Sequence, residues 1–158
     1  MLLKPELFKE GFLLFPFKLD DSLNQMVEQE NWPEVDQFFL TLTKPGGAIF
    51  NTLQTFHSFT QIETMISIRN GENEWEEDGI WHDDGSRVFA FSLSLNVKPE
   101  LMEGGSLELR RKNQDLSHSI LTPPFGTAIL FLTGVHGYEH RTRQVLKGRR
   151  IMLVGWCS

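Results

Sequence analysis

The segment RVFAFSLSL, Arg87–Leu95, decides the fold, because its side chains alternate between two kinds at every second residue. The bulky set is Phe89, Phe91, Leu93 and Leu95, and the small or polar set is Val88, Ala90, Ser92 and Ser94. Successive side chains of a strand point to opposite faces of its sheet. The bulky face predicts packing under helices, whereas the other face is typical of a cavity wall between two sheets.

The chain around this segment predicts a mainly β fold with N-terminal helices. Helical spacing of apolar residues is found in Asp20–Asn31 and in Asn31–Gly47. Strands are expected at Ala48–Leu53, Gln61–Arg69, Arg87–Leu95, Ser106–Arg110, Ser119–Leu121, Thr127–Leu132, Tyr138–Val145 and Arg149–Trp156. Turn residues and no helical segments separate these strands, which favours an antiparallel sandwich or jelly roll.

Composition limits the classes of protein that fit. At 158 residues the chain is long enough for one domain, 1–158, with a real core. Its net charge of −6 gives no reason to expect attraction to nucleic acid or an anionic membrane. No apolar run approaches the roughly 20 residues of a membrane span. The single cysteine, Cys157, excludes an intrachain disulfide framework and fits a cytoplasmic location.

The motif WHDDG places one histidine beside two carboxylates. In an extended strand His82 and Asp84 share a face while Asp83 points away, so Asp84 is the better candidate for a metal ligand beside His82. About 0.7 such pairs are expected by chance in this composition, so the motif needs support from elsewhere in the chain.

That support comes from the C-terminal segment HRTRQVLKGRRIMLVGW, His140–Trp156. A three-residue loop ending at Gly148 predicts a hairpin in which His140 and Arg150 share a face. A two-residue loop would separate them, because a one-residue slip reverses the faces.

Two histidines and a carboxylate on one face form a facial triad, which leaves open positions on a metal such as non-haem Fe(II). The candidates are His82, Asp84 and His140. Fe(II) with one carboxylate ligand has a net positive charge, and a chelating dianionic acid would make the net charge of the centre negative. A buried Arg150 would neutralise that charge. The planar fork of arginine also fits a carboxylate with two hydrogen bonds.

Four motifs together resemble those of a known family. They are HDD at 82–84, FSLSLN at 91–96, GGSL at 104–107, and the terminal His140, Gly148, Arg150 and Trp156. In order and spacing they are similar to the 2-oxoglutarate- and Fe(II)-dependent dioxygenases, nearest to the prolyl-hydroxylase-like branch.

The resemblance implies a double-stranded β-helix (jelly roll) with iron bound by His82, Asp84 and His140. It also implies that Arg150 holds the distal carboxylate of 2-oxoglutarate and that Ser94 lines the co-substrate pocket. The implied reaction is hydroxylation of an amino-acid residue, proline favoured, or of a small molecule, with formation of succinate and CO2. The primary substrate would be a small molecule, peptide or protein, and ascorbate is a candidate further cofactor.

Other interpretations remain open at this point. The motif HGYEH, His136–His140, matches a zinc-peptidase pattern, but its glycine and its strand-like surroundings disfavour the helix that this chemistry needs. A group of basic residues could bind a polyanion. Solvated lysines and arginines that prevent pairing of exposed strand edges are the simpler explanation. The group consists of Arg110, Arg111, Lys112, Arg141, Arg143, Lys147 and Arg149. The acidic run of residues 71–84 is either an inert loop or a lid that favours basic substrates. A non-catalytic carboxylate-binding or sensor module and a cupin-like metalloenzyme not using 2-oxoglutarate are the alternative functions.

Overall fold

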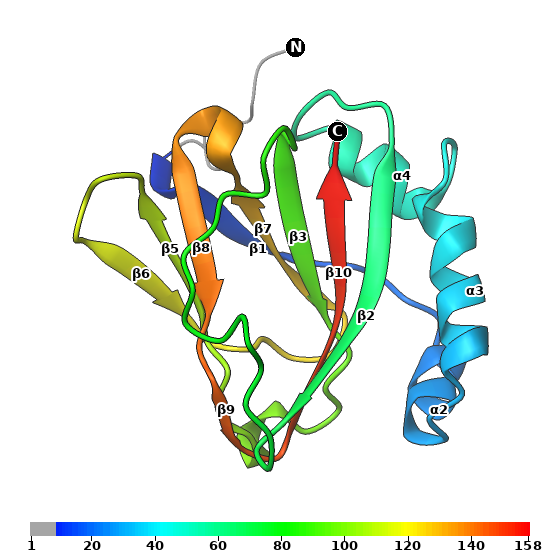
Figure 1. Ribbon diagram of the computed structural model, residues 1–158. Coiled ribbons are helices and arrows are strands. Elements are labelled where there is room, and N and C mark those ends of the chain that lie inside the picture. Colours follow the sequence, from blue (N-terminus) through cyan, green and yellow to red (C-terminus); the bar gives the residue numbers. More distant parts are fainter. Residues whose placement is uncertain (1–8) are drawn as a thin grey trace.

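The computed structural model describes residues 9–158 and contains two facing antiparallel sheets flanked by helices (Figure 1). The large sheet has the strand order β1-β7-β3-β10-β2, and the small sheet has the order β6-β5-β8. A separate two-stranded sheet pairs β4 with β9. The strands of the described chain are β1 (Phe12–Pro16), β2 (Ile62–Asn70), β3 (Phe89–Ser94), β4 (Glu103–Gly104), β5 (Leu107–Arg111), β6 (Ser117–Ile120), β7 (Thr127–Leu132), β8 (Tyr138–Thr142), β9 (Val145–Lys147) and β10 (Arg149–Cys157). This is the expected mainly β jelly-roll architecture.

The central strand β3 behaves as its alternation predicts. It lies between β7 and β10, and every residue of β3 is buried. Phe89, Phe91 and Leu93 are fully buried in the apolar core, which also contains buried residues of the helices. Ser92, on the opposite face, lines a cavity between the two sheets. One strand therefore serves both as core and as site wall.

Three helices pack beside the large sheet: α2 (Ser22–Glu28), α3 (Trp32–Thr43) and α4 (Ala48–Gln54) (Figure 1). The first two were expected. The strand expected at Ala48–Leu53 is wrong, because this segment is α4. Its buried residues Ile49, Phe50 and Leu53 have the spacing of one helical face, and a short apolar run does not distinguish a helix from a strand by periodicity alone. Strand β1, which pairs with β7, has no counterpart among the expected strands.

The expected C-terminal hairpin is also wrong in its pairing. Gly148 does adopt the left-handed conformation of the turn, with φ of 77°. However, β8 pairs with β5 in the small sheet, whereas β10 pairs with β2 and β3 in the large sheet. The intervening β9 pairs with β4, so the chain passes from one sheet to the other. His140 and Arg150 consequently approach the same cavity from opposite sheets, and they do not share one sheet face.

Two short 3-10 helices, Pro99–Leu101 and Gly134–His136, complete the regular elements described within 9–158. A search of the helices in this part of the chain finds none long and apolar enough to cross a membrane.

Candidate functional site

The backbones of His82 and His140 are joined directly. His82 donates its N–H to the carbonyl of His140 at 2.9 Å, and His140 donates to the carbonyl of His82 at 2.8 Å. This antiparallel bridge brings the centres of the two imidazole rings to 4.2 Å. Because His140 belongs to β8, the bridge attaches the loop that carries His82 to the edge of the small sheet.

Asp84 faces the histidines for a reason other than the one expected. It has a φ of 60° in the left-handed region and is followed by Gly85 at 64°, so the chain turns there and is not extended. Strand alternation therefore does not place Asp84 beside His82; a tight turn does. Asp83 points away, as expected, and forms an ion pair with Lys112. Its Oδ1 also accepts a hydrogen bond of 2.9 Å from the Gly85 N–H, which stabilises the turn.

The three side chains offer a compact set of donor atoms. Asp84 Oδ1 lies 3.5 Å from His82 Nε2, and Asp84 Oδ2 lies 3.3 Å from His140 Nε2. One candidate ligand atom from each residue falls within 4.8 Å of the others. Two donors that each lie about 2.1 Å from one ion are about 3 Å apart when they subtend a right angle. The spacing therefore fits one metal ion held from one side.

The protonation states of these groups also suit a metal. The Nδ1 atom of His82 lies 3.0 Å from the carbonyl of Ile80, which can only accept, so Nδ1 carries the proton and Nε2 has a free lone pair. Burial lowers the pKa of His140 to about 3, which keeps this ring neutral. Burial raises the pKa of Asp84, and its Oδ2 is buried without a hydrogen-bond partner. A bound cation would satisfy this oxygen, so the residues fit an iron ion.

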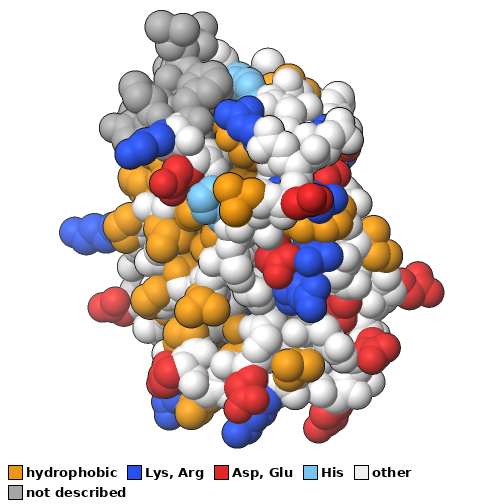
Figure 2. Space-filling view, turned by 90° about the vertical axis from the view of Figure 1, so that its left-hand side faces the viewer, with side chains coloured by type: hydrophobic (Ala, Val, Ile, Leu, Met, Phe, Trp, Pro, Cys, Tyr) orange, Lys and Arg blue, Asp and Glu red, His pale blue; other side chains and the backbone are white. Residues whose placement is uncertain are grey.

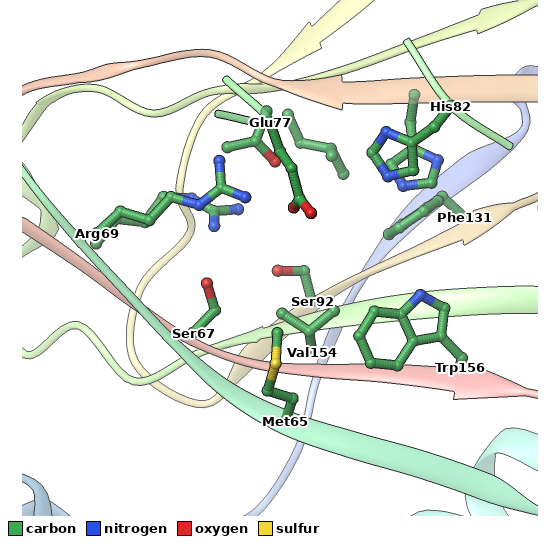
Figure 3. A pocket seen from close by; sticks show the side chains of 13 residues that line it. Met65, Ser67, Arg69, Glu77, His82, Ser92, Phe131, Val154 and Trp156 are labelled. Atoms are coloured by element: carbon green, nitrogen blue, oxygen red, sulfur yellow. The ribbon is translucent and has the colours of Figure 1, made fainter. Parts of the chain in front are cut away.

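A cavity of about 80 Å³, which we call the inner cavity, lies between the sheets beside this group (Figure 3). His82, His140 and Arg150 all line it. The remaining lining residues are Met65, Ser67, Arg69, Glu77, Ser92, Leu107, Phe131, Thr142, Val154 and Trp156. Two of the three metal-ligand candidates, His82 and His140, therefore share one enclosure with a guanidinium from the opposite sheet.

Arg150 is 3% exposed, and its Nε has no hydrogen-bond partner. Burial, followed by the charge of Arg69, lowers the pKa of Arg150 to about 9. The aliphatic stem of Arg150 packs against Gly105. That glycine has a φ of 72°, and a Cβ there would lie 3.0 Å from Arg150 Cδ. The GGSL motif thus provides both a left-handed backbone and room for the arginine.

Ser94 is not among the residues that line the inner cavity. It is fully buried, and its hydroxyl accepts hydrogen bonds of 3.3 and 3.1 Å from the backbone and the side chain of Asn96. Ser92, two residues earlier, lines the inner cavity, and its buried Oγ has no hydrogen-bond partner. A role for Ser94 in co-substrate binding stays a prediction.

A second cavity, of about 340 Å³, adjoins the site on its outer side, and we call it the outer cavity. Glu77, Ile80, His82, Asp84 and Trp156 line it. Glu77 and Trp156, like His82, line both cavities. Figure 3 shows the Glu77 carboxylate pointing from the acidic segment into the inner cavity, between Arg69 and His82. From the sequence this segment is predicted to be either an inert loop or a lid, and no local pattern marks Glu77 or Arg69 as a site residue.

The competing sites lose their support. In HGYEH, His136 ends a 3-10 helix, Gly137 is left-handed, and His140 belongs to a strand, so the two histidines share no α-helix. The basic residues are largely paired with acids, for example Arg110 with Glu139 and Arg141 with Glu108. Figure 2 shows basic and acidic side chains interspersed on this side of the molecule. This arrangement argues against a polyanion patch.

Two facing antiparallel sheets with a His-Asp-His donor group at one end of the enclosed cavity and a buried arginine at the other define a class of protein. That class is the non-haem metal oxygenases that bind a carboxylate co-substrate. A family model described as the 2OG-Fe(II) oxygenase superfamily matches residues 64–158. The chain therefore belongs to the 2OG-Fe(II) oxygenase superfamily, and it is an enzyme of the 2-oxoglutarate-dependent, non-haem iron type.

Solved structures agree on the fold. A prolyl-4-hydroxylase of Pseudomonas putida shares 18% identity at a TM-score of 0.62, with 96% of this chain and 90% of that one covered. An oxidoreductase of the 2OG-Fe(II) oxygenase family from Burkholderia pseudomallei shares 14% identity at a TM-score of 0.67, covering 97% and 88%. A Trichoplax adhaerens prolyl hydroxylase in complex with a hypoxia inducible factor peptide fragment shares 15% identity at 0.62, covering 96% and 85%. No curated protein sequence matches the chain.

Proposed function

We propose that this enzyme hydroxylates an amino-acid residue of a peptide or protein, proline being the first candidate, or a small molecule. Fe(II) would be held by His82, Asp84 and His140, and 2-oxoglutarate by Arg150. The observation that carries this proposal is that the two histidines of the His-Asp-His group line the same cavity as Arg150. The resemblance to structures of prolyl hydroxylases, one of them in complex with a peptide, supports the substrate class.

An iron ion held by His82, Asp84 and His140 would supply the redox chemistry that couples reduction of dioxygen to oxidative decarboxylation of 2-oxoglutarate to succinate and CO2. The chain itself contributes position and enclosure. His82, Asp84 and His140 would hold the ion as a facial triad, a ligand set that leaves positions for other ligands. Leu107, Phe131 and Val154 line the inner cavity with apolar surface, which limits the access of water to the reacting groups. Outer-cavity residues would contact the primary substrate.

Three further parts of the proposal are less direct. Residues 1–158 would form a single domain, which is supported by β1 and β10 joining one sheet from the two ends of the described chain. A cytoplasmic location is in keeping with the free, buried thiol of Cys157. Ascorbate would serve as a further cofactor, a suggestion that rests on the family resemblance alone.

The test is a substrate screen with two readouts. The purified enzyme, supplied with Fe(II), 2-oxoglutarate and dioxygen, would be incubated with prolyl peptides, lysyl peptides and free amino acids. We expect one class to stimulate succinate formation and to gain the mass of one oxygen atom. A matched incubation with the Asp84→Ala variant should give neither. Succinate formation that no substrate class stimulates, with no oxygenated product, would contradict the proposed hydroxylation.

A further inference from the structure

The inner cavity contains a second guanidinium. Arg69 of β2 lies directly opposite Arg150 of β10 in the antiparallel register. Cross-strand partners in such a register project from the same face of the sheet. Both arginines line the inner cavity, and Figure 3 shows the Arg69 side chain reaching into it. Two cationic side chains therefore approach the same end of the cavity from neighbouring strands.

At this end of the cavity, one of the two guanidiniums has no acidic partner. The Arg69 side chain is 12% exposed, and it forms an ion pair with Asp78 at 2.8 Å. Within residues 9–158, no carboxylate forms an ion pair with Arg150. The Nε atoms of both arginines are buried and without hydrogen-bond partners. Like charges held together in a protein interior are costly unless an anion compensates them. Asp78 pairs with Arg69, and Glu77 also lines the cavity but forms no ion pair with either arginine among residues 9–158. Arg150 therefore leaves a place for the carboxylate of a ligand.

We propose that Arg69 is a second carboxylate-binding residue of the inner cavity, acting together with Arg150 on the distal carboxylate of 2-oxoglutarate. This inference rests on the proposed binding of 2-oxoglutarate by Arg150. A carboxylate has two oxygens and can accept from two guanidiniums at once. Arg69 is thus a specificity-determining residue, because it favours 2-oxo acids with a second carboxylate over those without one.

Arg69 also has a structural role that the test must separate. Asp78 accepts from Arg69 and from the backbone N–H of Trp75, at 2.8 and 2.9 Å. The Arg69 guanidinium lies 5.1 Å from the centre of the Trp75 ring. Arg69 therefore also anchors the acidic segment that precedes His82. The Asp78→Asn variant weakens this anchor while it leaves the Arg69 charge in the cavity, so it is the matched control.

The experiment is an anaerobic titration of the Fe(II)-loaded protein, followed by the visible charge-transfer band of the iron–2-oxo acid complex. Each variant would be titrated with 2-oxoglutarate and with 2-oxopentanoate, which has the same chelating group but no distal carboxylate. For Arg69→Gln we expect 2-oxoglutarate to bind about 10-fold more weakly, with 2-oxopentanoate affinity unchanged. Asp78→Asn should keep the wild-type preference for 2-oxoglutarate, and Arg69→Lys should lose only part of it.

Three results would overturn the role of Arg69. The Arg69→Gln variant could bind both 2-oxo acids equally more weakly, or it could bind both with wild-type affinity. The third result is that Asp78→Asn reproduces the effect of Arg69→Gln. If Arg69→Gln fails to fold, the partial loss expected of Arg69→Lys decides in the same way. A wild-type protein that gives no band would contradict the proposed function itself. That failure differs from a wild-type band with an unchanged preference in the variants.

Discussion

The two ends of the inner cavity are built in opposite ways. At the metal end, a loop turn and a strand of the small sheet bring together two histidines and a carboxylate with an unsatisfied buried oxygen. At the arginine end, two paired strands of the large sheet hold two guanidiniums, and one of them, Arg69, is paired with Asp78. The first arrangement accepts a cation and the second accepts an anion. A ligand that satisfies both ends must be elongated, with a chelating group at one end and a carboxylate at the other.

The largest expected effect comes from removing the carboxylate of the metal end. The Asp84→Ala variant should lose more than about 100-fold in Fe(II) affinity and show no charge-transfer band with 2-oxoglutarate, because one of three ligands is gone. Metal binding by calorimetry under anaerobic conditions and the visible spectrum are the measurements.

Asp83→Asn is the matched control for this change. The neighbouring carboxylate points away and pairs with Lys112, so the control should keep both iron binding and the band. Equal losses in the two variants would mean that the turn matters and that Asp84 is no ligand.

A substitution at the arginine end should weaken co-substrate binding and leave metal binding unchanged. The Arg150→Gln variant should bind 2-oxoglutarate on the order of 100-fold more weakly and keep its Fe(II) affinity, because a buried charged partner is lost far from the metal. The titration of the charge-transfer band separates the two affinities. Arg149→Gln is the control, since Arg149 is exposed and pairs with Glu30 outside the cavity. Loss of iron affinity in Arg150→Gln would show that the two ends are not independent.

The same contrast explains how much of the site the sequence could predict. His82, Asp84 and His140 could be found because metal ligands have recognisable residue types, and Asp84 was chosen over Asp83 even though a left-handed turn, and not a strand, orients it. Arg150 was found from a hairpin register that does not exist. Arg150 nevertheless lines the same cavity as the two histidines, because both sheets face that cavity, and its role stays a prediction.

Arg69 and Glu77 could not be found in this way. Their place in the cavity depends on the pairing of β2 with β10 and on the path of the acidic segment, which are tertiary features without a local pattern. The fold followed from the alternation in β3, whereas Ala48–Gln54 was assigned to a strand because a short apolar run fits either structure.

A pH experiment probes the neutral state of the metal end. Burial lowers the pKa of His140 from 6.5 to about 3, so below pH 6.5 the unfolded chain binds a proton that the folded chain does not. The free energy of unfolding of the metal-free protein should therefore fall as the pH falls, on the order of 1–2 kcal/mol between pH 6.5 and about 5 for this group. Urea denaturation at the two pH values measures it.

The control for the pH experiment has to remove one group only. The raised pKa of Asp84 acts in the opposite direction, because the folded state takes up that proton at higher pH than the unfolded state does. In His140→Gln the His140 contribution disappears and that of Asp84 remains, so the variant should lose less stability on acidification than the wild type. The exposed His118, changed to Gln, should leave the wild-type pH dependence as it is. An unchanged dependence in His140→Gln would contradict a neutral, buried ring.

The smallest expected effect concerns the carboxylate that lies between the two ends. Glu77 lines the inner cavity, whose volume of about 80 Å³ is well below the roughly 300 Å³ at which ligand pockets begin. A dianionic co-substrate must therefore displace or repel this side chain as it enters. The Glu77→Gln variant should bind 2-oxoglutarate about 3-fold more tightly, a modest gain because the residue is exposed and its charge is screened. Glu76→Gln removes the neighbouring charge of the same segment and should change the affinity less. If both variants tighten binding equally, the segment acts only through its overall charge. If Glu77→Gln weakens binding, Glu77 is part of the co-substrate binding site and does not compete with the co-substrate.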